Sequence, residues 1–172
     1  MRYFTPELVS SLNSSDSDTV DEAMVRWESA LSSYQKHLQK IHRDMPPQLQ
    51  PLTNLSLHDW QVLKISDGKD RANPRGATMV IALGNIGEVM FLSYSLRQKP
   101  RRIDSPQGWP LAKNRVDWLY DEVDFDRDDQ KSFVHRILFS DGTTLVIPFS
   151  KCSVTPVNYR RAMSHSDLMQ IA

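Results

Sequence analysis

The segment from Val20 to Met45, VDEAMVRWESALSSYQKHLQKIHRDM, decides the fold. Apolar or aromatic residues recur along it at alternating intervals of four and three positions, at Val20, Met24, Trp27, Leu31, Tyr34, Leu38, Ile41 and Met45. This spacing places them in one stripe on an α-helix, because about 3.6 residues complete each turn. A helix of this length spans roughly 38 Å at about 1.5 Å per residue. The segment therefore predicts a long amphipathic helix that covers another layer of the protein.

Both ends of this helix carry boundary signals. Residues 19–22 match a capping box, in which side-chain oxygens satisfy free backbone N–H groups, and Asp18 is an alternative cap. The two prolines at 46–47 stop the helix, because proline lacks the N–H that helical hydrogen bonds need. The segment PPQLQPL, residues 46–52, is then predicted to be a stiff connector.

A shorter helix is expected before the long one. Thr5 can cap its first turn, Pro6 suits the first helical position, and Glu7 complements the positive end of the helix dipole. Asn13 and the Ser/Asp run after it end this helix. Residues 1–47 are therefore predicted to form a helical segment packed on a sheet.

The hydrophobic period changes from about 3.6 to about 2 after residue 54, which is typical of β-strands. Strands are predicted near Leu57–Ile65, Ala77–Leu83, Val89–Arg97, Arg115–Phe125, Ser132–Phe139 and Thr143–Phe149. Residues 54–157 are interpreted as an antiparallel β domain and residues 158–172 as a tail, within a single compact domain overall. The predicted fold class is α+β, with a short helix and a long amphipathic helix packed on a curved or barrel-like antiparallel sheet of five or six strands.

The last two predicted strands form a hairpin around Asp141-Gly142, a pair that fits a two-residue type I′ turn. That turn predicts the register Leu138 to Leu145, Arg136 to Ile147 and Val134 to Phe149. Both faces of the hairpin are then apolar, so both need a cover. The long helix can cover one face. The other cover must come from sheet curvature, the short helix, the long loop or a second chain.

The composition excludes several classes of function. Lys plus Arg and Asp plus Glu number 21 each among 172 residues, and the zero net charge argues against broad attraction to nucleic acid or anionic lipid. Cys152 is the only cysteine, which excludes an intrachain disulfide and a cysteine-based zinc site. No apolar stretch suits a signal peptide or a membrane span of about 20 residues, so we expect a cytoplasmic protein without membrane contact.

The sequence His58-Asp59-Trp60 invites a catalytic interpretation, but a structural one is favoured. Neighbouring side chains in a strand point to opposite faces, so His58 and Asp59 would not pair there. In a turn, Asp59 is a turn or cap residue. Trp60 is predicted to anchor the core.

Catalytic and metal-binding signatures are weak. The chain has no P-loop, GxGxxG, GxSxG or HExxH motif, which favours a non-enzymatic role. The alternative is a small-molecule hydrolase in which His58, Glu122 and His135 surround one pocket. Carboxylates at 124, 126 and 128 alternate as in a calcium loop, but Asp129 and His135 stand where that loop needs Gly and Glu. No metal or cofactor is predicted.

The basic stretch RQKPRR, residues 97–102, offers a second alternative, a weak nucleic-acid contact through Arg97, Lys99, Arg101 and Arg102. A solvated loop is the favoured interpretation, because aromatic side chains do not alternate with the basic ones. Trp109, farther along the same Pro-rich connection, either pins the loop to the core or anchors a partner, and pinning is preferred.

The leading hypothesis is a non-enzymatic protein-interaction module that binds another protein or its own copy, as in a homodimer. It rests on the long apolar stripe, the zero net charge and the lack of a catalytic constellation. The predicted contact residues are Trp27, Leu31, Tyr34, Leu38 and Trp109.

Three segments together resemble a bacterial family, a domain of unknown function whose members open with Met-Lys/Arg-Tyr-Phe-Thr. They are MRYFT at residues 1–5, LSLHD at 55–59 and HRILFSDGTTLVIPF at 135–149. The resemblance covers the N-terminal helical part and parts of the sheet. It implies a bacterial cytoplasmic protein and brings no catalytic residues to this chain.

Overall fold

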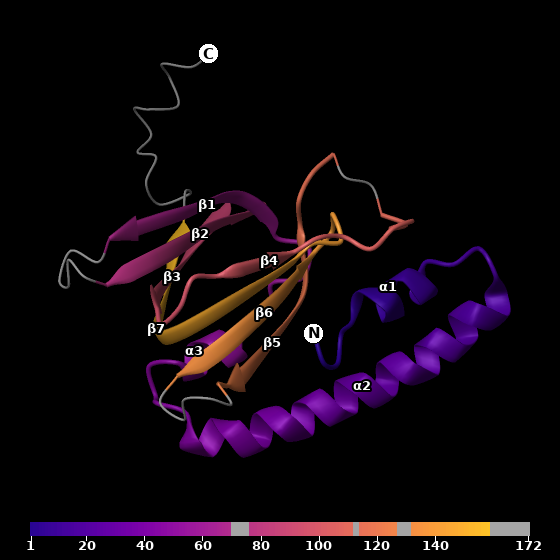
Figure 1. Ribbon diagram of the computed structural model, residues 1–172, viewed down its shortest axis with the longest axis horizontal. Coiled ribbons are helices and arrows are strands. Elements are labelled where there is room, and N and C mark those ends of the chain that lie inside the picture. Colours follow the sequence, from indigo (N-terminus) through magenta and orange to yellow (C-terminus); the bar gives the residue numbers. More distant parts are fainter. Residues whose placement is uncertain (70–75, 112–113, 127–131, 159–172) are drawn as a thin grey trace, which may run out of the picture.

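The computed structural model describes residues 1–69, 76–111, 114–126 and 132–158 (Figure 1). The helices are α1 (Pro6–Leu12), α2 (Ser17–Asp44) and α3 (Gln50–Thr53). The strands are β1 (Gln61–Lys69), β2 (Ala77–Asn85), β3 (Glu88–Leu96), β4 (Arg101–Ile103), β5 (Trp118–Phe125), β6 (Phe133–Phe139) and β7 (Thr144–Asn158). Within these residues the strands form one antiparallel sheet in the order β1-β2-β3-β7-β6-β5, with β4 paired to β7. The predicted α+β class is confirmed.

The long helix α2 is continuous, as its apolar period predicts, but it begins earlier than expected. Asp16 is the N-cap, and its carboxylate accepts a hydrogen bond of 3.0 Å from the backbone N of Thr19. The predicted capping box at residues 19–22 is therefore wrong, because Asp16 already satisfies the first turn and Thr19 lies inside the helix. The helix ends at Asp44, just before the prolines.

The short helix α1 agrees with its prediction, whereas the connector after α2 differs from its prediction. Thr5 caps α1 through the backbone N of Leu8, as predicted. The connector 46–52 is not merely a stiff spacer, because α3 begins within it. Leu49 and Leu52 there are buried in the main core, which explains why the chain turns helical at this point.

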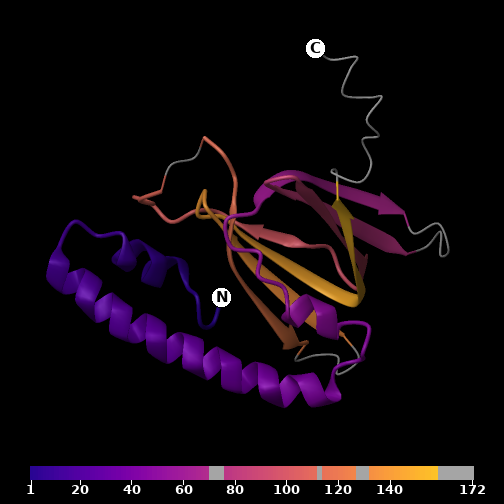
Figure 2. The ribbon, with the colours of Figure 1, turned by 180° about the vertical axis from the view of Figure 1, so that it is seen from behind.

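The sheet curls until its two outer strands meet at one end. Trp118 donates its backbone N–H to the carbonyl of Trp60 at 2.8 Å, and Val62 donates to Val116 at 2.8 Å. The result is a half-barrel whose opening is flanked by α2 and α3, while the N-terminus lies between α2 and the sheet (Figure 2). The bent strand β7 joins the two halves, pairing with β4 and β6 through its first part and with β3 through its second.

The loop of the hairpin between β6 and β7 contains one residue more than predicted. Phe139 donates to the carbonyl of Thr143, and Leu138 pairs with Thr144, so Ser140, Asp141 and Gly142 form a three-residue loop. Gly142 has φ +80°, whereas Asp141 does not have a positive φ, which excludes a type I′ turn. A Cβ on Gly142 would also lie 2.7 Å from the Trp109 ring.

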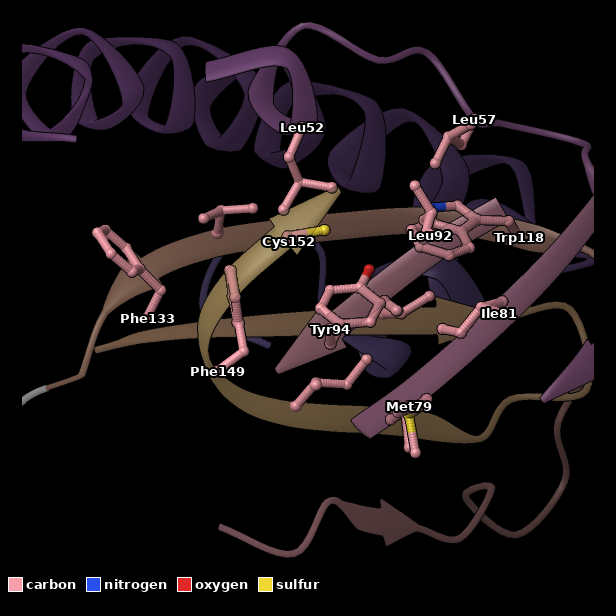
Figure 3. Close-up of a cluster of buried hydrophobic side chains, with 14 of the residues drawn as sticks. Leu52, Leu57, Met79, Ile81, Leu92, Tyr94, Trp118, Phe133, Phe149 and Cys152 are labelled. Atoms are coloured by element: carbon pink, nitrogen blue, oxygen red, sulfur yellow. The ribbon is translucent and has the colours of Figure 1, made fainter. Parts of the chain in front are cut away.

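The register of this hairpin is therefore shifted from the predicted one. The observed pairs are Phe133 with Phe149, Val134 with Pro148, His135 with Ile147, Arg136 with Val146 and Ile137 with Leu145. The inner face carries the main core, which includes Leu92, Tyr94, Trp118, Phe133 and Phe149 (Figure 3). A smaller cluster of Val9, Trp109, Leu119 and Leu138 covers the outer face of β5 and β6. Curvature, the short helix and the long loop thus supply the second cover.

The stripe of α2 is covered unequally along its length. Tyr34 and Ile41 are buried against the sheet and Leu38 packs on the main core. Met24 near the N-terminal end and Leu31 near the middle of the helix remain exposed, Leu31 to 40%. None of the described helices is long and apolar enough to cross a bilayer.

Candidate functional site

The three residues of the predicted hydrolase site do not converge. Glu122 in β5 and His135 in β6 face opposite sides of the sheet, since Glu122 contacts the N-terminal segment and His135 contacts Tyr94 in the core. His58 lies in an exposed turn, where its Nδ1 is 2.9 Å from Asp59 Oδ2. The predicted strand begins only at Gln61, so the argument that the two side chains of a strand diverge does not apply here. Asp59 is a turn residue with φ +66°, which is the other alternative that the sequence offers. The geometry does not provide the pocket that a His/Glu hydrolase requires.

Glu122 is a buried anchor for the N-terminus. Only 2% of the residue is exposed. Its Oε1 accepts hydrogen bonds from the backbone N–H groups of Arg2, Tyr3 and Phe4 at 2.9, 2.7 and 2.9 Å, and its Oε2 accepts a second one from Arg2 at 2.7 Å. Both carboxylate oxygens are therefore engaged by the backbone of the N-terminal segment rather than open to a substrate. No sequence motif predicts this contact, because its donors are backbone N–H groups that lie far from Glu122 in the sequence.

His135 is the centre of a buried polar network. Its Nε2 lies 3.0 Å from Asp121 Oδ2, and its Nδ1 lies 2.9 Å from the Tyr94 hydroxyl. Asp121 also accepts a hydrogen bond of 3.0 Å from the indole N–H of Trp118. A carboxylate can only accept, so Nε2 carries the proton and Nδ1 accepts from Tyr94. The histidine is fully buried with both nitrogens satisfied, which indicates a structural role.

Cys152 lies beside this network. It pairs with Tyr94 across β3 and β7, and it lines a pocket of about 640 Å³ together with Leu49 and Ser95. Burial raises the pKa of the Cys152 thiol to about 12, with a smaller opposing effect from its hydrogen bond with Tyr94. The thiol is therefore protonated at neutral pH and is not an activated nucleophile.

We expect Cys152 to be unreactive until the protein unfolds. A disulfide reagent such as DTNB should label the chain in denaturant at pH 8 and leave the native protein unlabelled, because the thiolate is the reactive form. The folded state keeps this proton up to about pH 12. Its contribution to stability is complete below the pKa of the thiol in the unfolded chain, near 9, and is lost as the pH rises from there through about 12. Equal labelling rates in native and denatured samples would contradict this assignment.

The predicted contact residues are largely used inside the molecule. The Tyr34 hydroxyl accepts the backbone N–H of Val123 at 2.8 Å and thereby covers the outer edge of β5. The Trp109 indole donates to the carbonyl of Ser140 at 2.8 Å, which pins the long loop as the sequence favours. Tyr34 and Trp109 are both buried. The prediction that they contact a partner protein is therefore not supported by their positions.

Two other predicted contact residues are partly covered. Trp27 packs on Phe4 and Tyr120, with ring centroids 5.0 and 4.6 Å apart, and Leu38 packs on the main core. Leu31 is the member of the predicted set that stays exposed. The helical stripe is therefore mainly an internal seam.

An apolar surface does remain uncovered, on the outer face of β1, β2, β3 and the end of β7. We define this outer apolar patch as Leu63, Ile86, Val89, Phe91 and Val157. The register places Val89 between Gly84 and Val157. Leu63 covers Gly84, where an added Cβ would lie 3.0 Å from the leucine. Ile86 at the β2–β3 turn is 90% exposed and Leu63 is 51% exposed.

The basic stretch 97–102 does not form one face. Arg101 and Arg102 lie on β4, a strand that was predicted to be loop, and successive side chains of a strand point to opposite sides. Arg102 pairs with Asp141 at 3.1 Å, whereas Arg101 lines a separate pocket with Arg2 and Arg136. The aspartate-rich stretch extends into residues 127–131, which lie outside the described residues, and so does the predicted tail beyond residue 158.

Comparison with known proteins identifies no relative. No protein-family model, curated protein or solved structure matches this chain. The resemblance carried by MRYFT and the two later segments therefore stays a prediction.

Proposed function

We propose that the protein is a non-enzymatic interaction module that pairs with a second copy of itself through the outer apolar patch. The observation that carries this proposal is Ile86, a large apolar side chain that is 90% exposed at the tip of the β2–β3 hairpin. The neighbouring exposed side chains Leu63, Phe91 and Val157 extend the same surface over several strands. Contiguous apolar patches of this kind mark interaction sites on proteins.

The hairpin itself does not require an isoleucine at this position. Gly87 supplies the positive φ of +74° that the turn needs. The backbone N–H of Ile86 is satisfied by the Asn85 side chain at 2.8 Å. The Ile86 side chain adds nothing to the core, so its apolar character supports a role outside the chain.

A second copy is the partner that this surface fits best. Ile86 protrudes beside a recess of about 440 Å³, whose apolar wall includes Leu63 and whose rim carries Asp59, Glu88 and Arg115. Two-fold pairing would bring each Ile86 to the partner's recess, where Arg115 is already neutralised by Asp117 of its own chain at 2.7 Å. The zero net charge removes long-range repulsion between copies.

Ile86→Asp is expected to abolish self-association. Size-exclusion chromatography with light scattering should show the wild type shifting from dimer to monomer on dilution from about 200 to about 1 µM, and the variant monomeric throughout. The fold should persist, with a change in unfolding free energy within about 0.5 kcal/mol, because the side chain is on the surface.

The matched control is Val25→Asp, the same kind of change at a 69% exposed position of α2. This control variant should give the same dilution curve as the wild type. A wild type that is monomeric at every concentration would overturn the proposal. If Ile86→Asp and Val25→Asp weakened dimer formation equally, the outer apolar patch would not be the dimer interface.

A bacterial cytoplasmic setting belongs to this proposal. It is supported by the resemblance of the N-terminal segment and by the single, unpaired Cys152, which suits a reducing compartment. A weak nucleic-acid contact is not favoured, because Arg101 and Arg102 face different sides and Arg102 is engaged by Asp141.

A further inference from the structure

Three arginines meet at a pocket on the other half of the sheet. The pocket has a volume of about 530 Å³ and lies on the outer face of β4, β5, β6 and the first part of β7. Its polar wall comprises Arg2, Gln98, Arg101, Arg136, Asp124 and Asp126. Val134, Val146 and Pro148 form its apolar floor. The outer apolar patch lies elsewhere, so the two surfaces can be tested separately.

The sheet register explains why the arginines converge. Arg101 in β4 and Arg136 in β6 both pair with Val146 of β7 and share its face. Strands lie about 4.8 Å apart, so the two Cα atoms are separated by about 10 Å, a span that two arginine side chains can bridge. Glu122 of β5 pairs directly with Arg136 of β6. The Glu122 carboxylate also holds the backbone of Arg2, which brings the third arginine to the same place.

The charges in this pocket are unevenly matched. Among the described residues, no ion pair or side-chain hydrogen bond engages the guanidinium of Arg101 or Arg136, and that of Arg2 lies over the Tyr3 ring at 5.2 Å. Asp124 is already engaged by His37 at 3.1 Å, and Asp126 accepts from Ser132. The pocket therefore presents guanidinium donors in excess of free carboxylate.

From this arrangement we infer that the pocket binds the phosphate group of a small phosphate ester. Guanidinium groups match the geometry of phosphate oxygens, and several of them are needed to balance a dianion. The apolar floor gives the organic part of the ligand a surface to pack on. A nucleic-acid strand fits less well, because it needs a basic track along its backbone rather than one closed cluster.

The test uses the full chain and two defined probes, inorganic phosphate and glycerol phosphate, with glycerol as the unphosphorylated comparison. Isothermal titration calorimetry at low salt should detect both phosphates and no glycerol. Arg101→Gln and Arg136→Gln should each weaken binding by at least about tenfold, because each removes a charge-assisted contact. Arg97→Gln, an exposed arginine outside the pocket, should leave the affinity within about twofold of the wild type.

Thermal unfolding of both pocket variants establishes that they are folded before binding is measured. The inference is overturned if neither phosphate binds the wild type at about 10 mM, or if both variants bind as the wild type does. Binding of a single-stranded oligonucleotide without binding of free phosphate would also overturn it, in favour of a nucleic-acid surface. Self-association is measured separately in the same samples, so that a failure of the dimer proposal and a failure of the phosphate proposal can be told apart.

Discussion

Glu122→Ala is expected to destabilise the protein by about 3–5 kcal/mol, because it removes the shared acceptor of several backbone N–H groups, each of which costs about 1–3 kcal/mol when it is left unpaired in the interior. The substitution leaves the buried N–H group of Phe4 and the partly buried N–H groups of Arg2 and Tyr3 without their acceptor. It also frees Phe4, whose ring packs on Trp27 and Tyr34. A loss of this size is a large fraction of the stability of an ordinary domain.

Urea denaturation measures this loss, and hydrogen exchange at residues 2–4 tests its origin. The free energy of unfolding of Glu122→Gln should lie between those of the wild type and Glu122→Ala. The amide keeps one accepting oxygen, but its NH₂ group then faces backbone N–H groups, which are also donors. Glu28→Ala, at an exposed position of α2, is the control and should change the free energy of unfolding by no more than about 0.5 kcal/mol. A Glu122→Ala protein as stable as this control would show that the N-terminal segment is not anchored by the carboxylate.

His135→Leu is expected to cost about 3 kcal/mol, because the Tyr94 hydroxyl loses its acceptor inside the barrel and Asp121 loses a donor. Tyr94→Phe alone should cost about 1–2 kcal/mol for the lost hydrogen bond. The double variant should cost less than the sum, by at least about 1 kcal/mol, since the unpaired hydroxyl that penalises His135→Leu is then absent.

A double-mutant cycle from urea denaturation provides the measurement. Thr19→Ala at the start of α2 is the matched control, and its effect should add to that of His135→Leu within about 0.5 kcal/mol. Additive effects for the Tyr94 and His135 pair would mean that their contact contributes nothing to stability, contrary to the geometry.

The long helix and most strands could be predicted because their signals are local. The four-three spacing from Val20 to Met45 fits a helix and no other regular structure, and the short apolar runs between turn residues after residue 54 indicate strands. Finer features failed where the sequence permits two solutions. Asp16 and Thr19 are both good caps, and a glycine at 142 suits either a two-residue or a three-residue loop.

The surfaces were harder to predict, because their partners are distant in the chain. Leu63 and Phe91 are apolar strand residues like those of the core, and only the curl of the sheet decides which face is enclosed. Glu122 looks like an ordinary strand carboxylate until the backbone of residues 2–4 arrives beside it. Arg101 and Arg136 become neighbours only through a register that pairs both with Val146.

The bent strand β7 has a consequence for the chain during its synthesis. Strands β1 to β3 can form a meander from residues 61–96 alone, but the free side of β3 is completed only by residues 149–158. Since the ribosome releases the N-terminal part first, β3 keeps a bare backbone edge until nearly all described residues have emerged. Nascent chains that stall before β7 should therefore be especially prone to aggregate and to need chaperones.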